Sequence, residues 1–275
     1  MKYKLFAADM DGTALNTKKE LTPRTVAAME KAAEQGKTVV FSTGRSISLI
    51  KPYIDMVKGM RYAVTASGAS VIDLKTGEKI LYETMDAETV KHIIAAAAGC
   101  SAMPIIFIND KTYSNSWCIE RCADFGLAYY QPIYRIGMTA VDDAFAYFME
   151  NPDRVEKLNL FFDNDYEADT VYDMIKDLPV TFTSRTSRSL EINASGVSKA
   201  RGLAALCGRL GIEMSECIAI GDAQNDEELL SSVGFKIAMA NGSDKVKSIA
   251  DVIAPDCDSE GVAVAVEQYF LDYVK

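Results

Sequence analysis

Short apolar runs followed by polar residues or glycine recur in the first third of the chain. They occupy residues 5–8 (LFAA), 39–41 (VVF) and 62–65 (YAVT). Runs of this length with such ends predict buried strands. Between the first two runs, Thr22 and Pro23 predict a helix start and Gly36 predicts its end. Strand, helix and strand in this order predict a parallel sheet with crossover helices.

The pattern changes after residues 70–82, where alternation around Thr76-Gly77 predicts a hairpin. Helices are predicted over the alanine-rich residues 86–98 and over 142–148 and 165–176. Strands are predicted around residues 105–108, 158–162, 180–182 and 190–192. This mixture of helices and strands indicates a separate α+β unit with its own sheet.

From residue 197 the first pattern returns. Helices are predicted over residues 199–207 and 227–231, and buried strands over 217–220 and 236–239. The predicted fold class is therefore α/β. A Rossmann-like parallel-sheet core, residues 1–82 plus 189–275, receives an inserted α+β domain, residues 83–188. Hinges between the two are expected near residues 83–84 and 186–187.

Composition and charge narrow the choice of partners. Hydrophobic residues make up 49% of the 275-residue chain, which is enough for sizeable cores. The formal net charge of -10 disfavours binding to nucleic acid or to an anionic membrane. It also repels a phosphate ester, so a site for such a substrate would need a local cation.

Cysteine usage and hydropathy bear on the cellular setting. The six cysteines are scattered without a C-x-x-C pair, and the chain has one histidine, so no structural zinc site is predicted. We find neither a signal-peptide pattern nor an apolar run of about 20 residues. A cytoplasmic protein without a membrane span is expected. The apolar pattern marks no clear subunit interface, and we expect a monomer.

Two carboxylates directly follow the first predicted strand, in Asp9-Met10-Asp11-Gly12-Thr13. Ligands bind beyond the carboxyl ends of parallel strands, and carboxylates buried there need a counter-charge. Magnesium, which prefers hard oxygen ligands, would supply it. Taken alone, the same residues also fit a solvated Asp-Gly turn.

A second group, Thr43, Gly44 and Arg45, follows the second predicted strand. A hydroxyl, a backbone amide and a guanidinium together would form a cradle for a phosphate. The alternative is an ordinary helix cap with Thr43 as the capping residue.

Two more candidates lie late in the chain. Asp222, Asn225 and Asp226 follow a predicted strand and offer oxygen ligands, although a capped helix start would use the same residue types. Lys199 is an isolated lysine near a predicted helix start, where a solvated side chain is the ordinary outcome.

In this order the four groups resemble the haloacid dehalogenase superfamily of phosphohydrolases, and more narrowly its Cof-type branch with a type IIB cap. The likeness extends over essentially the whole chain and includes residues 66–69 (ASGA), 190–199 (LEINASGVSK), 238–242 (AMANG) and 260–262 (EGV). The chain departs from the branch at Ser67, where asparagine is frequent, and at Leu229 or Leu230, where methionine is usual.

The resemblance implies a magnesium-dependent phosphatase that acts on a small phosphorylated metabolite, such as a sugar phosphate, with the inserted domain as a cap. It implies that Asp9 is a nucleophile forming an aspartyl phosphate and that Asp11 is the general acid and base. The implied magnesium ligands are Asp9, Asp11 through its carbonyl, Asp222, Asn225 and Asp226. The implied phosphate ligands are Thr43, Gly44 and Lys199, and Arg45 is the implied substrate contact.

Two alternatives stay open at this point. A hexose-phosphate phosphomutase would use the same Asp9 and Asp11 but would return the phosphoryl group to the substrate, with a bisphosphate activator. A non-catalytic phosphoacceptor or ligand-binding module is the other; receiver domains also end strands in acids but lack the second acid and the large insertion. Arg185 and Arg188 either contact substrate or cap the edge of the inserted domain.

Overall fold

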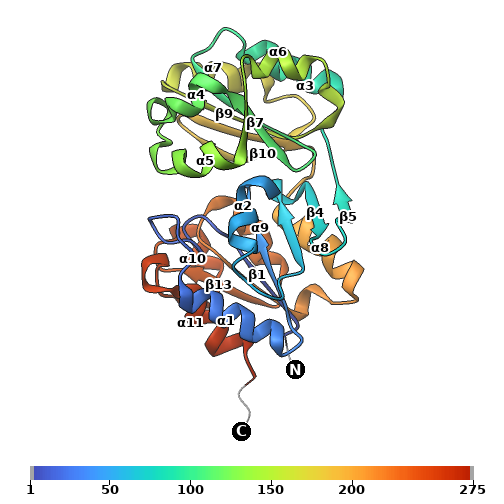
Figure 1. The fold of residues 1–275 in the computed structure, drawn as a ribbon, viewed down its shortest axis with the longest axis vertical. Helices are drawn as coiled ribbons and strands as arrows, with labels where there is room; N and C mark the ends of the chain where they lie inside the picture. Colours follow the sequence, from blue (N-terminus) through green and yellow to red (C-terminus); the bar gives the residue numbers. More distant parts are fainter. Residues whose placement is uncertain (1–2, 273–275) are drawn as a thin grey trace. The chain divides into compact units, whose positions relative to one another are not determined.

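The computed structural model describes residues 3–272 and divides into two compact units (Figure 1). The first unit comprises the described residues of Met1–Gly44, Ile50–Leu81 and Ser198–Lys275, and the second comprises Arg45–Leu49 and Tyr82–Val197. In Figure 1 the first unit is mostly blue to cyan and orange to red, and the second is mostly green to yellow. Within the described residues, no helix combines the length and the hydropathy that crossing a bilayer requires.

The first unit is built on one sheet with the strand order β14-β13-β12-β1-β2-β3-β4-β5. The bounds are β1 (Leu5–Ala8), β2 (Thr38–Ser42), β3 (Tyr62–Thr65), β4 (Ser70–Asp73), β5 (Lys79–Tyr82), β12 (Cys217–Gly221), β13 (Phe235–Met239) and β14 (Val252–Ala254). Neighbouring strands from β14 to β3 are parallel, and β4 is antiparallel to β3. The expected parallel sheet is confirmed, and β1, fully buried, lies between β2 and β12.

Helices cover both faces of this sheet. On one face, Leu203 of α8 (Lys199–Leu210) and Leu230 of α9 (Glu227–Ser232) join the cluster that contains Leu5 of β1. On the other face, the ring of Phe6 lies 5.5 Å from that of Phe270, close to α1 (Pro23–Glu34). The remaining helices and helical turns of this unit are α2 (Ile47–Ile54, shared with the second unit), η1 (Ala66–Gly68), η5 (Met214–Glu216), η6 (Gln224–Asp226), α10 (Asp244–Ile249), η7 (Cys257–Ser259), α11 (Gly261–Ala265) and η8 (Val266–Phe270).

Local sequence explains where the two long helices of this unit begin. The Thr22 side chain accepts a hydrogen bond from the Thr25 amide and Pro23 is the first residue of α1, as the sequence predicted. Ser198 caps α8 in the same way, by accepting from the Arg201 amide. The cap fixes Lys199 as the first residue of α8.

The second unit has its own sheet, with the strand order β10-β11-β9-β6-β7-β8. The strands are β6 (Ala102–Ile108), β7 (Lys111–Asn115), β8 (Met138–Val141), β9 (Val155–Phe162), β10 (Val180–Thr186) and β11 (Ser189–Ala194). The helices and helical turns are α3 (Ala87–Ala97), α4 (Ser116–Glu120), η2 (Cys122–Phe125), η3 (Ala128–Tyr130), α5 (Gln131–Gly137), α6 (Ala144–Met149), η4 (Pro152–Arg154) and α7 (Asp165–Ile175). All described pairings are antiparallel except β7 with β8.

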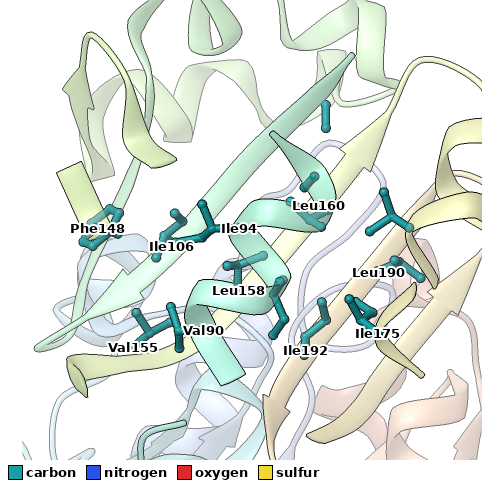
Figure 2. Close-up of a cluster of buried hydrophobic side chains, with 14 of the residues drawn as sticks. Val90, Ile94, Ile106, Phe148, Val155, Leu158, Leu160, Ile175, Leu190 and Ile192 are labelled. Carbon is teal, nitrogen blue, oxygen red and sulfur yellow. The ribbon is translucent and has the colours of Figure 1, made fainter. Parts of the chain in front are cut away.

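The core of the second unit lies between its sheet and the helices α3, α6 and α7. Figure 2 shows apolar side chains from both layers in contact, among them Val90 and Ile94 of α3 and Leu158 and Leu160 of β9. Leu158 and Leu160 alternate along β9 with Lys157 and Asn159, which face the opposite side of the sheet and are also buried.

One predicted boundary is wrong. The sequence placed the return to the core at residue 189 and a hinge at 186–187, but Ser189–Ala194 forms β11, which pairs with β10 and β9 in the second sheet. Residues 186–189 are the tip of the β10–β11 hairpin, where the Thr186 and Ser189 hydroxyls lie 2.7 Å apart. The second unit therefore extends to Val197.

Candidate active site

Strand register brings three of the predicted groups to one edge of the first sheet. Ala8 of β1 pairs with Phe41 of β2 and with Ile220 of β12. Asp9 directly follows Ala8, and Thr43 and Asp222 come two residues after the paired positions on the neighbouring strands. Because these strands are parallel, all three residues emerge at their carboxyl ends, where ligands bind in such sheets.

Lys199 links two carboxylates at this edge. Its Nζ atom donates to Oδ1 of Asp9 at 2.6 Å and to Oδ1 of Asp226 at 2.7 Å. All three residues are buried, with exposed fractions of 5% or less. A buried lysine needs such partners, because an unpaired ammonium in this environment would be strongly destabilising. Lys199 is therefore part of the carboxylate cluster rather than a solvated surface lysine.

Asp226 uses both of its carboxylate oxygens within the protein. Oδ1 accepts from Lys199, and Oδ2 accepts from the amides of Asp222 and Ala223 at 3.0 and 3.1 Å. The family resemblance implies that Asp226 is one of the metal ligands. Both oxygens of Asp226 thus have partners within the protein, and its part in holding a metal stays a prediction.

Asp222 faces the loop that follows β1. The Thr13 hydroxyl donates to Oδ1 of Asp222 at 2.7 Å. Gly12, at a φ of +79°, permits this approach, since a Cβ atom there would lie only 2.5 Å from Oδ2 of Asp222. The Asn241 side chain donates to the Gly12 carbonyl at 2.7 Å, which fixes the same loop from the other side.

Burial perturbs the charges of this cluster. Burial raises the pKa of Asp9 well above its usual range. The neighbouring Lys199 ammonium lowers this pKa, whereas the carboxylates of Asp226 and Asp222 raise it further. Burial also raises the pKa of Asp222, to about 6. Burial alone would lower the pKa of Lys199, but the carboxylates of Asp226 and Asp9 outweigh it, so the net shift is upward. The cluster therefore holds more negative charge than Lys199 alone can balance.

The donor set fits a hard divalent cation. Carboxylate oxygens of Asp9, Asp222 and Asp226 lie within 4.8 Å of one another. Oδ1 of Asn225 is buried with no hydrogen-bond partner among the described residues, and a cation is one way to satisfy such an oxygen. An all-oxygen donor set with excess negative charge is typical of magnesium sites.

Asp11, the second carboxylate of the loop, has a partner that the sequence analysis missed. Lys19 Nζ lies 2.9 Å from Oδ1 of Asp11. Lys19 sits in a polar stretch without hydrophobic periodicity, so no sequence signal distinguished it from Lys18. Thr13 and Asn241 were also missed as contacts, although both lie in segments that carried the family resemblance.

The groups after β2 fall in different units. Thr43 is buried, and its backbone is fixed by hydrogen bonds with Val64 and Ser67. Arg45 is grouped with the second unit, where its guanidinium carbon lies 5.5 Å from the centre of the Tyr130 ring. The phosphate-binding role of Thr43 and Gly44 and the substrate contact of Arg45 stay predictions.

Arg185 and Arg188 each pair with an aspartate of α7. Arg185 donates to Asp169 at 2.9 Å and Arg188 to Asp165 at 2.8 Å. All four side chains are more than 40% exposed, so these are surface ion pairs at the edge of the second unit.

Comparison with known proteins adds three findings. A family model described as haloacid dehalogenase-like hydrolase matches residues 6–266. The chain is 27% identical to the 5-amino-6-(5-phospho-D-ribitylamino)uracil phosphatase of Bacillus subtilis, over 98% of this chain and 96% of that protein. A second Bacillus subtilis protein, the phosphatase YwpJ, is 26% identical over 94% of this chain and 97% of its own length.

Solved structures share the fold. A haloacid dehalogenase-like hydrolase from Bacteroides thetaiotaomicron aligns with a TM-score of 0.84 at 24% identity, covering 98% of this chain and 100% of that one.

Proposed function

Because this chain belongs to the haloacid dehalogenase-like hydrolases, we propose that it is a magnesium-dependent phosphatase that hydrolyses a small phosphorylated metabolite through an aspartyl phosphate on Asp9. One observation carries the proposal. Asp9 is buried at the carboxyl end of the central strand and accepts a hydrogen bond from Lys199. The carboxyl group of Asp11 lies two residues further along the same loop.

In the first half-reaction, an Asp9 carboxylate oxygen attacks phosphorus and the bond from phosphorus to the ester oxygen breaks. Asp11 gives its proton to that oxygen, which leaves as an alcohol. Lys199, oriented by Asp226, offsets negative charge on the phosphoryl oxygens together with Thr43 and the Gly44 amide.

In the second half-reaction, Asp11 accepts a proton from water while the water oxygen attacks phosphorus. The bond from phosphorus to the Asp9 oxygen breaks, which releases inorganic phosphate and restores both carboxylates to their initial states. Asp9, Asp222, the Asp11 carbonyl and Asn225 would hold magnesium, with Asp226 behind them. The ion would supply positive charge next to the phosphoryl group.

The substrate proposal rests on the relatives. Since the Bacillus subtilis relative acts on a phosphorylated ribityl compound by name, the panel of candidates includes that ester. Sugar phosphates, pyridoxal phosphate and flavin mononucleotide complete it, and Arg45 is the proposed contact to the part of the substrate beyond the phosphate. We also propose that the protein is cytoplasmic and that it is a monomer. Light scattering on the purified chain tests the monomeric state.

The deciding experiment measures hydrolysis of p-nitrophenyl phosphate with magnesium and with EDTA. Wild type should turn over only with magnesium, and Asp9→Asn should lose at least about 1,000-fold in kcat because it removes the nucleophile. Asp55→Asn is the matched control, since Asp55 is an exposed partner of Lys51 in an i,i+4 pair. Turnover retained in Asp9→Asn would refute the aspartyl phosphate.

A second variant separates the half-reactions. Asp11→Asn should leave a phosphorylated Asp9 that intact-protein mass spectrometry detects, while steady-state turnover falls. An unchanged turnover rate in this variant would refute the role of Asp11. Activity that appears only after addition of a sugar bisphosphate would instead identify a phosphomutase.

A further inference from the structure

Lys19 reaches the proposed acid from a turn outside the four motifs. Its Nζ atom lies 2.9 Å from Oδ1 of Asp11, with the two side chains 20% and 28% exposed. Lys18, the preceding residue, is exposed, and its backbone amide belongs to the same turn. One of two adjacent lysines is thus directed to the acid.

The backbone around Lys19 has an unusual conformation that the sequence maintains. Lys19 has a φ of +62°, in the left-handed region that a residue with a Cβ rarely occupies. Asn16 stabilises this turn, because its Oδ1 accepts from the amides of Lys18 and Glu20 at 3.0 and 2.8 Å. The Asn16 carbonyl accepts from the Lys19 amide at 2.9 Å. Strained backbone kept in place by such bonds clusters at functional sites.

Two further contacts anchor the turn to the rest of the first unit. The Tyr53 hydroxyl of α2 donates to the Lys19 carbonyl at 2.9 Å. On the other side, the amide and hydroxyl of Thr17 both donate to Oδ1 of Asp258 at 2.9 Å. The turn that carries the Lys19 side chain is therefore held by contacts on two sides. This limits where the Lys19 ammonium can lie.

We propose that Lys19 is a positioning residue that holds the Asp11 carboxylate in the orientation required for proton transfer. The inference rests on the proposed function, since it assigns Lys19 a role only through Asp11. A general acid must lie within hydrogen-bond reach of the oxygen that it protonates, and small displacements of a reacting group reduce rates strongly. A mobile surface ion pair would not need a strained and anchored turn.

The leaving group separates this role from simple substrate binding. An alkyl phosphate needs a proton on its leaving oxygen, whereas p-nitrophenolate leaves without one. Lys19→Met, which removes the charge but keeps much of the stem, should lower kcat about 10- to 100-fold for an alkyl phosphate, with KM changed less than about two-fold. In single-turnover phosphorylation of Asp9, which excludes the water step that also uses Asp11, the loss should be much smaller for p-nitrophenyl phosphate than for the alkyl phosphate. Lys19→Arg should restore part of the loss.

Lys18→Met is the matched control, because it removes the same charge one residue away from the same turn. It should keep wild-type kcat on both substrates. Melting temperatures of all three variants identify a loss that comes from unfolding. If Lys18→Met and Lys19→Met lose the same activity, the effect is one of general charge and the proposal is wrong.

A double-mutant cycle closes the test. In an Asp11→Asn background, Lys19→Met should not slow the single-turnover phosphorylation of Asp9 any further, because the group that it positions is already absent. A full additional loss in that background would mean that Lys19 acts directly on substrate, and would overturn the inference. Wild-type turnover together with its loss in Asp9→Asn tests the proposed phosphatase activity separately, so either failure can be recognised.

Discussion

Lys199 is almost fully buried, yet its ammonium stays charged because the carboxylates of Asp9 and Asp226 contact it directly. These two carboxylates and Asp222 share one lysine at the end of the sheet. The excess negative charge makes the metal-free cluster costly for the folded state, and a cation would remove that cost. Cation binding at this site would therefore be coupled to folding stability.

The raised pKa of Asp222 gives that coupling a pH dependence. Its folded-state pKa is about 6 against an ordinary value of 3.8, so the folded state favours the protonated form. Its contribution to stability is complete below the unfolded-state pKa and is lost as pH rises through about 6. Without metal, the free energy of unfolding should therefore fall across this window, and magnesium should offset the fall.

Thermal unfolding with EDTA or magnesium measures the effect. Magnesium should raise the melting temperature of wild type more at about pH 7.5 than at about pH 4.5, because the ionised carboxylates bind it. Asp222→Asn should show a smaller increment and a weaker dependence on pH. An equal increment at both pH values would contradict the assignment of Asp222 to the metal site.

Single residues of this site differ in how far the sequence revealed them. Asp9 and Asp222 follow apolar runs, so the rule on strand ends located both. Lys199 in isolation is indistinguishable from a surface lysine, and only the family resemblance identified it. Lys19 carries no signal, because its role depends on a left-handed turn that the local sequence does not determine alone.

At the scale of elements, η1 and the start of α8 approach each other closely. A Cβ atom on Gly68, which has a φ of +101°, would lie 2.0 Å from the Ser198 carbonyl oxygen and 3.1 Å from the Lys199 nitrogen. Glycine at this position therefore sets how near the first turn of α8 comes to the sheet. The place of Lys199 thus depends on the absence of a side chain at Gly68.

Gly68→Ala should displace that turn. Gly77→Ala is a matched control, because Gly77 also has a positive φ, of +75°, but a methyl group there would meet nothing within 4 Å. Both variants should lose about 1–2 kcal/mol to backbone strain. Only Gly68→Ala should also lose at least about 10-fold in kcat. Equal kcat values in assays of the two variants would show that the contact does not matter for catalysis.

Most helices and strands followed from periodicity, and the errors have physical causes. Residues 116–137 form short helices and turns without a sustained period, so no element was assigned there. The strand at 190–192 was found, but a strand pattern does not specify its partner. Pairing with β9 and β10, which put β11 in the second sheet, is a tertiary choice.

At the scale of the whole molecule, each unit has its own hydrophobic core. Leu158 is fully buried in the second unit, and Leu203 is fully buried in the first. Cores with separate residue sets allow the units to lose structure at different free energies. A single free energy of unfolding would then not describe the chain.

Leu158→Ala and Leu203→Ala form a matched pair. Each should destabilise its own unit by about 2–5 kcal/mol through a cavity and lost burial. Hydrogen exchange followed by mass spectrometry should show faster exchange in residues 82–197 for Leu158→Ala, and in the first unit for Leu203→Ala. Uniformly faster exchange in both variants would indicate one cooperative unit.

The position of β1 between β2 and β12 has a consequence for biosynthesis. Asp9 leaves the ribosome early, but the strand that pairs with the other side of β1 begins only at Cys217, after the whole second unit has been made. Until then the nascent chain carries an apolar strand with one open edge, which is a site for aggregation or chaperone binding. A message truncated before the codon for Asp226 would yield a protein that has Asp9 but lacks the complete cluster around it.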